Sequence, residues 1–165
     1  MKNSHFLQPR YDEVEHLSIE RTFDAKLVQS IISDEELHKR AGLRVEVSMY
    51  DPENQKDIYY LIPRRNSWVL GVIVFDLFNH PICYQGHVNY IPEKWGSGLA
   101  KYTKAAIQWM FDNTDCLKVI ALATDTYPEV LKQTKKAGLK VEGYLEKSII
   151  TNDILVNQTI MGIEK

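Results

Sequence analysis

The segment from Ile91 to Ala100, Ile-Pro-Glu-Lys-Trp-Gly-Ser-Gly-Leu-Ala, limits most strongly what this chain can fold into. An apolar strand ends there, Gly96 and Gly98 follow, and a helical pattern starts at Leu99. The first amides of a helix have no internal partner and carry partial positive charge. Glycines let the backbone come close to a phosphate. The segment therefore predicts a phosphate-binding loop, although a plain strand–turn–helix connection fits the same letters.

Upstream of this loop the apolar residues alternate with polar ones, which is typical of strands. The alternation predicts a strand through Val45, Val47 and Met49 and a turn at Asp51–Asn54. A turn at Asn79–Pro81 would then return the chain in an antiparallel meander. The remaining strands are expected at Asp57–Ile62, Trp68–Phe78 and Ile82–Ile91.

The N-terminal part shows helical rather than alternating spacing. Residues 1–20 form no clear pattern and predict an irregular segment. Apolar residues spaced by three and four predict a helix over Phe23–Ile32. The capping box Ser33–Glu36 predicts a second short helix, which ends near Ala41 and Gly42.

Downstream of the loop, the pattern predicts two more helices and three more strands. Lys118–Ala123 is apolar without alternation, as in a strand buried on both faces. Pro128 marks a helix start and Gly138 its end. A helix from Leu99 carries apolar residues at Tyr102, Ala106, Trp109 and Met110, and a C-terminal hairpin pairs Val141–Thr151 with Asp153–Ile163.

The order of elements predicts a single domain over residues 1–165 of the α+β class. Its sheet is mixed but mostly antiparallel, and helices flank it. The helix after Gly98 connects Ile82–Ile91 to Leu117–Thr124. We therefore expect these two strands to be parallel neighbours that diverge at their C-terminal ends.

Composition narrows the partners. The 165 residues are 44% hydrophobic and 25% charged, with a net charge of −2, which argues against general affinity for nucleic acid or an anionic membrane. The longest apolar stretch, Trp68–Phe75, is far shorter than the roughly 20 residues of a spanning helix. No signal peptide is recognisable, so we expect a cytoplasmic protein. Cys83 and Cys116 lack metal-ligand spacing, and we expect reduced, buried thiols and no metal site.

The strand order and the loop together resemble the GNAT N-acetyltransferase superfamily. Its Q/R-x-x-G-x-G/A loop, which binds the pyrophosphate of CoA, corresponds here to Glu93–Gly98. The segment Ala137–Gly143 resembles the GFxxEG segment of the same superfamily. The resemblance implies a GNAT fold, an acyl-CoA-binding unit over residues 82–124, acetyl-CoA as co-substrate and an amine acceptor.

The resemblance also implies particular site residues. The backbone near Asn89, Tyr90 and Ile91 would pair with pantetheine, and Tyr127 stands where a CoA-contacting Asn is usual. Lys94 would offset the charge of Glu93 if its ammonium turned to the phosphates. The backbone amides expected to take the pyrophosphate are those of Trp95, Gly96, Ser97, Gly98, Leu99 and Ala100.

Besides Tyr127, three positions depart from the family pattern. Glu93 replaces the usual Gln or Arg, Thr134 stands at the position of the tyrosine that protonates the thiolate, and Val130 at that of an alternative serine. The usual general acid is therefore absent. His87 is the best candidate for a general base because imidazole titrates near neutrality; a histidine that only packs on the sheet is the alternative. Asp76, Glu142 and Glu146 are weaker candidates, and no base is placed beside Ser148 for a hydrolase.

Three functions remain open at this point. The first is an N-acetyltransferase acting by direct attack of an amine. The second follows from a narrower likeness, carried by His87–Pro92, Trp109–Phe111 and Gly162–Lys165, to GNAT-like bacteriophage proteins, some of them linked to head assembly. It implies a catalytically weak or inactive assembly protein, in the host cytoplasm or a virion, with a protein partner or phage particle. The third is a sensor that binds CoA without turnover.

Overall fold

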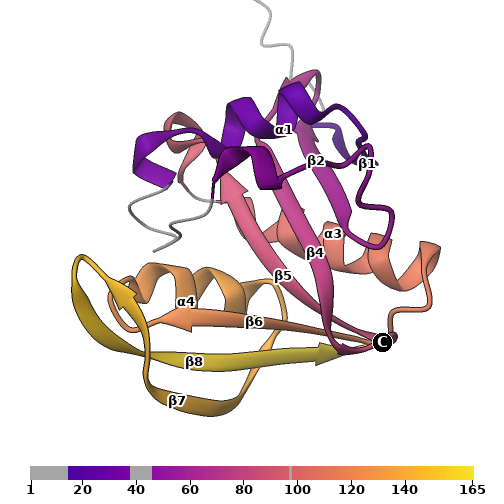
Figure 1. The fold of residues 1–165 in the computed structure, drawn as a ribbon. Coiled ribbons are helices and arrows are strands. Elements are labelled where there is room, and N and C mark those ends of the chain that lie inside the picture. Colours follow the sequence, from indigo (N-terminus) through magenta and orange to yellow (C-terminus); the bar gives the residue numbers. More distant parts are fainter. Residues whose placement is uncertain (1–14, 38–45, 97) are drawn as a thin grey trace, which may run out of the picture.

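The computed structural model describes residues 15–37, 46–96 and 98–165. Within them, eight strands form one sheet and the helices lie against its two faces (Figure 1). The strands are β1 Leu17–Arg21, β2 Tyr59–Arg65, β3 Trp68–Val69, β4 Gly71–His80, β5 Cys83–Tyr90, β6 Lys118–Thr124, β7 Lys140–Thr151 and β8 Ile154–Glu164. The α-helices are α1 Ala25–Ile32, α3 Leu99–Asn113 and α4 Pro128–Lys136, and the 3₁₀ helices are η1 Val47–Met49 and η2 Pro92–Lys94.

The sheet has the strand order β1-β2-β4-β5-β6-β8-β7, with β3 paired to β2. Among the described strands, β5 and β6 form the one parallel pair, and every other pair is antiparallel. The helix α3 connects this parallel pair. The predicted α+β class and mixed sheet are thereby confirmed.

The parallel pair is short, as expected for diverging strands. Its register runs from Cys83 opposite Lys118 to Gln85 opposite Ile120 and ends there. β6 continues as a partner of β8 up to Thr124 opposite Gln158. In Figure 1, β5 and β6 leave a common point and separate towards their C-terminal ends. The predicted splay is confirmed.

Two apolar clusters, one on each face, fix the helices to the sheet. On one face, Tyr102 and Met110 of α3 are fully buried against Phe75 of β4, and Leu131 of α4 packs on the same cluster. On the other face, Val28 of α1 is buried against strand residues that include Val72. Burial of this kind is the main favourable term in folding. It places α3 and α4 on one face and α1 on the other.

The strand predicted through Val45, Val47 and Met49 is wrong where the structure describes it. Val47–Met49 is a 3₁₀ helix, and Val45 lies outside the described residues. The alternating apolar side chains find no sheet face, since Met49 is 61% exposed. Side-chain amides hold the segment instead: Gln55 Nε2 donates to the Met49 carbonyl and Gln29 Nε2 to the Tyr50 carbonyl.

One strand that the sequence did not predict, β1, lies in the segment expected to be irregular. β1 pairs with β2 from Leu17 opposite Arg65 to Arg21 opposite Leu61. Leu17 and Ile19 pack against the cluster under α3. Residues 1–14 of the predicted irregular segment lie outside the described residues.

The other strand boundaries shift by a few residues. β2 continues beyond its predicted end at Ile62. Its partner changes from β4 to β3 there, and the Pro63 carbonyl accepts a hydrogen bond from the Leu70 amide. The predicted strand Trp68–Phe78 is divided at Leu70 into β3 and β4. A Cβ on Gly71 would lie 2.2 Å from the Asn89 carbonyl oxygen, so only glycine allows β4 to start there. His80, predicted in a turn, is the last residue of β4.

The start and end of α4 follow the predicted signals, and two other helix starts differ. α1 starts at Ala25, two residues after the predicted Phe23, because the Asp24 carboxylate caps it by accepting from the Leu27 amide at 3.0 Å. Pro128 opens α4, and Gly138 follows it with φ +108°. The next short helix is capped by Asp34, which accepts from the amides of Glu36 and Leu37, rather than by Ser33. Its predicted end near Ala41 lies outside the described residues.

The C-terminal hairpin and the cysteines complete the fold. β7 and β8 pair from Lys140 opposite Gly162 to Thr151 opposite Ile154, as predicted. Both thiols are free; Cys116 is buried as expected, whereas Cys83 is partly exposed because it lies at the start of β5. Among the described residues, no helix is long and apolar enough to cross a membrane.

Candidate functional site

The site begins at an unpaired edge of β5. Beyond Gln85, β6 no longer pairs with β5, and no other described strand takes its place on that edge. The Ile91 amide donates to the Leu70 carbonyl on the side of β4, at 2.9 Å. Because backbone groups point to alternate edges along a strand, Val88 and Tyr90 face the unpaired edge. Of the residues expected to pair with pantetheine, Tyr90 faces this edge and Asn89 and Ile91 face β4, while Val88 is an additional residue on the edge.

The loop after β5 is held by two aromatic side chains. Trp95 Nε1 donates to the Tyr90 carbonyl at 2.8 Å. The Tyr90 hydroxyl donates to the Leu99 carbonyl at 3.1 Å and lies 2.9 Å from Thr103 Oγ1, so it ties β5 to the first turn of α3. Burial raises the pKa of Tyr90, which keeps this hydroxyl protonated. These side chains therefore position the loop between β5 and α3.

The glycines leave open space in front of α3. Gly96 and Gly98 have φ values of +154° and +98°, in the region that favours glycine. A Cβ built on either would meet no described atom within 4 Å. Gly98 is the N-cap of α3 and has no side chain with which to cap it. The side chains of Leu99 and Ala100 are buried, so these residues offer their amides, while Ser97 lies outside the described residues.

Glu93 and Lys94, which carry opposite charges, lie at the start of the loop. Glu93 is exposed. Lys94 Nζ lies 4.9 Å from the centroid of the Trp68 ring, in a cation–π contact. The ammonium expected at the phosphates thus lies over an exposed indole.

The opposite side of the splay is formed by the end of β6 and the start of α4. Tyr127 is the N-cap of α4. Val130 of α4 is 41% exposed; across the splay, Val88 of β5 is 43% exposed. Thr134 Oγ1 donates to the Val130 carbonyl at 2.8 Å, so its hydroxyl is bound within the helix. This side therefore offers apolar surface and no acidic side chain at the position of the usual tyrosine.

His87 lies on the sheet face that α1 covers, next to Val74 of β4. Its Nε2 is 3.1 Å from Asp76 Oδ1, and both side chains are partly exposed. A carboxylate at Nε2 favours the tautomer with the proton there and leaves Nδ1 as the acceptor. Of the weaker candidates, Glu142 forms an ion pair with Lys118 at 2.8 Å, and Glu146 is exposed.

Nucleophiles and metal ligands are not assembled among the described residues. Burial raises the pKa of Cys116 to about 11 and also raises that of Cys83, so neither thiol ionises readily. The Ser148 hydroxyl donates to Gln158 Oε1 at 3.0 Å and has no histidine partner. No group of three or more His, Cys, Asp or Glu side chains gathers within residues 15–37, 46–96 and 98–165.

Comparison with known proteins identifies the fold. No family model and no curated protein matches the sequence. Spermidine N-acetyltransferase from Vibrio cholerae, solved with CoA and spermine, matches with a TM-score of 0.77 at 13% identity over 90% of this chain and 95% of that one. A GNAT-family acetyltransferase from Bacillus anthracis matches with a TM-score of 0.70 at 19% identity, over 91% and 95% of the two chains.

A third solved structure, ribosomal-protein-S5-alanine acetyltransferase from Vibrio fischeri, has a TM-score of 0.73 at 14% identity, with 92% of this chain and 94% of that one covered. The chain therefore has the GNAT acetyltransferase fold. At these identities the similarity establishes the fold alone.

Sequence reasoning missed two features of the site. The backbone of Val88 faces the unpaired edge, which the register of β4 and β5 determines. Asp76 pairs with His87 from the neighbouring strand. Strand alternation predicts which sheet face Asp76 and His87 lie on. The register that makes these two residues neighbours depends on the turn at the end of β4.

Proposed function

We propose that this protein is an acetyl-CoA-dependent N-acetyltransferase. The observation that carries the proposal is the continuity of two binding features. The unpaired edge of β5 runs directly into the glycine loop, and the loop ends at the uncapped N-terminus of α3. A strand edge suits the amides of pantetheine, and a helix N-terminus suits a pyrophosphate.

In the proposed complex, acetyl-CoA lies along the splay. Backbone groups of Val88 and Tyr90 pair with the pantetheine arm. The amides of the loop and first turn of α3, from Trp95 to Ala100, take the pyrophosphate. Lys94 moves from the Trp68 ring to the phosphates, which compensates the charge of Glu93. Tyr127, at the start of α4, borders the arm on its other side.

The proposed reaction is direct transfer. An amine nitrogen of the acceptor attacks the thioester carbonyl, a C–N bond forms, and the C–S bond breaks to release the CoA thiolate. The nitrogen loses its second proton to solvent as the amide forms. His87 accepts the proton that the ammonium form of the acceptor must lose, and Asp76 orients its ring. Holding both substrates in contact supplies much of the rate increase.

The thiolate leaves without a protonating side chain in this proposal. Thr134 replaces the usual acid, and its hydroxyl is bound to the helix backbone. Because a CoA thiol is acidic enough to leave as an anion near neutral pH, the missing acid slows the reaction without preventing it. We expect turnover to be slow, by up to about 10²–10⁴-fold relative to an enzyme with general-acid help.

A second candidate is a protein that binds CoA with little or no turnover. Glu93 beside the phosphates and the bound hydroxyl of Thr134 favour it. An assembly role in a phage particle would be one form of this candidate, and its support is the sequence pattern alone. The intact glycine loop favours retained cofactor binding in either case.

The deciding experiment is an acetyl-transfer assay. The protein is incubated with acetyl-CoA and a panel of polyamines, aminoglycosides and peptides with free N-termini, and CoA release and acetylated product are both measured. Gly98→Asp serves as the control that removes cofactor binding. Product formed by the wild type and lost in the control supports the enzyme. Binding of acetyl-CoA without any product would support the second candidate and overturn the first.

A further inference from the structure

The glycine loop supplies too little positive charge for the whole of CoA. Beyond its pyrophosphate, CoA carries a 3′-phosphate monoester, with a charge of about −1.5 to −2 at pH 7. The loop offers amides and Lys94, and Glu93 opposes that lysine. Charge that would pair with the remaining phosphate is available on a neighbouring element.

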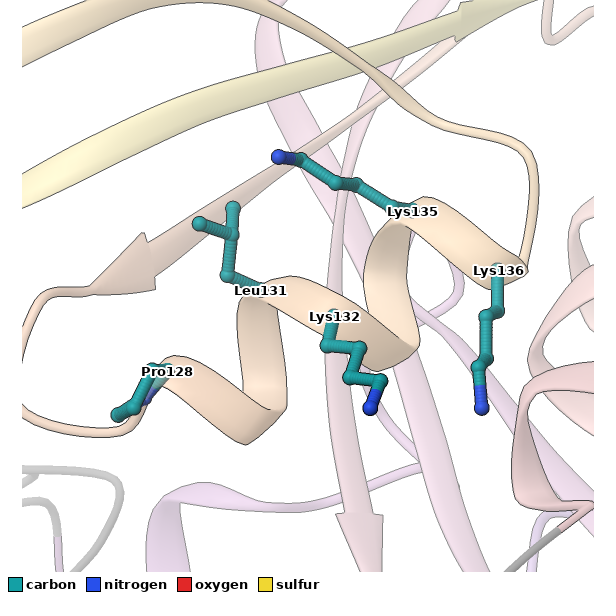
Figure 2. Close-up of a pocket in the computed structure, with 5 residues that line it drawn as sticks. All are labelled: Pro128, Leu131, Lys132, Lys135 and Lys136. Atoms are coloured by element: carbon teal, nitrogen blue, oxygen red, sulfur yellow. The ribbon is translucent and has the colours of Figure 1, made fainter.

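The neighbouring helix α4 carries a pocket lined with lysines. The pocket has a volume of about 490 Å³, and it is formed by Pro128, Leu131, Lys132, Lys135 and Lys136 (Figure 2). In Figure 2, Lys132 and Lys136 extend to the same side of α4, and Lys135 extends to the other. All three lysines are exposed, while Pro128 and Leu131 provide apolar surface.

Among the described residues, the three lysines of α4 have no acidic partner, and the same holds for Lys104 of α3, whereas two lysines near the sheet are paired. Lys118 pairs with Glu142 and Lys101 with Glu15, both at 2.8 Å. Among residues 15–37, 46–96 and 98–165, no carboxylate lies within ion-pair distance of Lys132, Lys135 or Lys136.

The helix dipole explains only part of this arrangement. Lysines in the last turn of a helix stabilise its C-terminus, which accounts for Lys135 and Lys136. It does not account for Lys132, which lies one turn earlier. Lys132 and Lys136 are spaced by four residues, a spacing at which like charges repel. A bound anion would relieve that repulsion.

The fold brings this pocket beside the proposed cofactor path. α3 follows β5 and α4 follows β6, so both helices start at the diverging ends of the two strands. α3 and α4 pack against the same apolar cluster and contact each other. A ligand whose pyrophosphate is held at the start of α3 therefore leaves the splay next to α4.

We propose that Lys132 and Lys136 bind the 3′-phosphate of acyl-CoA, with Pro128 and Leu131 contacting the adenosine. This assignment rests on the proposed function, because it needs CoA in the splay. It adds a specificity element that recognises CoA over a pantetheine compound without the 3′-phosphate.

The test is a thermodynamic cycle between two ligands and two proteins. Calorimetry measures the Kd of acetyl-CoA and of 3′-dephospho-acetyl-CoA for the wild type and for Lys132→Gln/Lys136→Gln. We expect the double variant to bind acetyl-CoA roughly 5- to 20-fold more weakly, as for loss of a charge-assisted contact at an exposed site. Its affinity for the dephospho ligand should match that of the wild type. Lys26→Gln/Lys56→Gln, which removes the same charge from exposed positions outside α4, should change neither Kd.

Each outcome decides the assignment. Equal weakening for both ligands, or no weakening for either, would overturn the role of Lys132 and Lys136 while leaving the proposed function intact. Failure of the wild type to bind acetyl-CoA at all would overturn the proposed function and this assignment together. Circular dichroism of the double variant establishes that α4 remains folded.

Discussion

At the residue scale, the proposed chemistry depends on the pairing of His87 with Asp76. The two side chains come from neighbouring strands and meet on the face opposite α3, with 3.1 Å between Nε2 and Oδ1. An imidazole oriented in this way presents one nitrogen to an incoming ammonium group. The carboxylate acts through the histidine, so Asp76 is a positioning residue in the proposed mechanism.

Replacing His87 should test that role directly. We expect His87→Ala to lower kcat by about 10²–10⁴-fold, the usual contribution of general-base help. The loss should shrink at high pH, where the acceptor amine deprotonates without assistance. Asp76→Asn should give a smaller loss, and adding it to His87→Ala should have no further effect. A His87→Ala variant with full activity across the pH range would remove His87 from the mechanism.

Thr134→Ala provides the matched control for this experiment. The Thr134 hydroxyl is bound to the Val130 carbonyl, so its removal should leave kcat unchanged. A large loss of kcat in Thr134→Ala would show instead that this hydroxyl protonates the leaving group.

A second prediction at this scale concerns acid stability. Hydrogen bonds from Lys101 and Tyr102 lower the pKa of Glu15 from 4.5 to about 2, and Arg65 lies 3.0 Å from the same carboxylate. A lowered pKa in the folded state adds stability that is present above pH 4.5 and is lost as the pH falls towards 2. Glu15→Gln should therefore lower the urea midpoint at pH 7, and this difference should disappear near pH 2. An equal difference at both pH values would contradict the assignment.

At the element scale, the position of the loop depends on two aromatic side chains. Trp95 and Tyr90 hold the chain between β5 and α3 in place by hydrogen bonds to main-chain carbonyls. We expect Trp95→Phe to keep the packing but to lose the bond from Nε1. One hydrogen bond contributes about 0.5–1.5 kcal/mol, so the Kd of acetyl-CoA should rise by roughly 2- to 10-fold. Trp109→Phe, in the middle of α3, should leave the Kd unchanged. Equal effects of the two variants, measured by calorimetry, would argue against a specific role of the loop anchor.

The acidic residue at the start of the loop gives a prediction of opposite sign. Glu93→Gln removes a negative charge beside the pyrophosphate, and the affinity for acetyl-CoA should increase by about 3- to 5-fold at low salt. The gain should diminish at high ionic strength, because salt screens exposed charges. Glu53→Gln, an exposed change outside the loop, is the control. Weaker binding by Glu93→Gln would show that the carboxylate itself assists the cofactor.

Elements whose pattern and burial agree could be predicted from the sequence, and the others could not. The spacing in α1, the apolar run of β6 and the turn residues of the C-terminal hairpin each match a buried surface in the fold. Val47–Met49 alternates without a sheet to join, and β1 is a short edge strand whose pairing with β2 spans a long stretch of chain. The glycine loop was predictable because its chemistry is local. The partner of His87 was not, because it depends on the register between two strands.

At the scale of the whole molecule, the divergence of β5 and β6 separates two halves of one sheet (Figure 1). β1 to β5 lie on one side of the divergence, and β6 to β8 lie on the other. The glycine loop borders the first half and the start of α4 borders the second. In the proposed complex, acyl-CoA occupies this divergence.

Titration of ¹⁵N-labelled protein with acetyl-CoA, followed by amide NMR, tests that claim most directly. The predicted result is a large shift of the Val88, Tyr90, Gly96, Gly98 and Leu99 amides, with Asn89 and Ile91 shifting less because their amides face β4. Amides of α1 and of the tip of the β7–β8 hairpin should stay in place. Absence of any shift at millimolar acetyl-CoA, or shifts confined to surfaces away from β5, the loop and α4, would contradict the account.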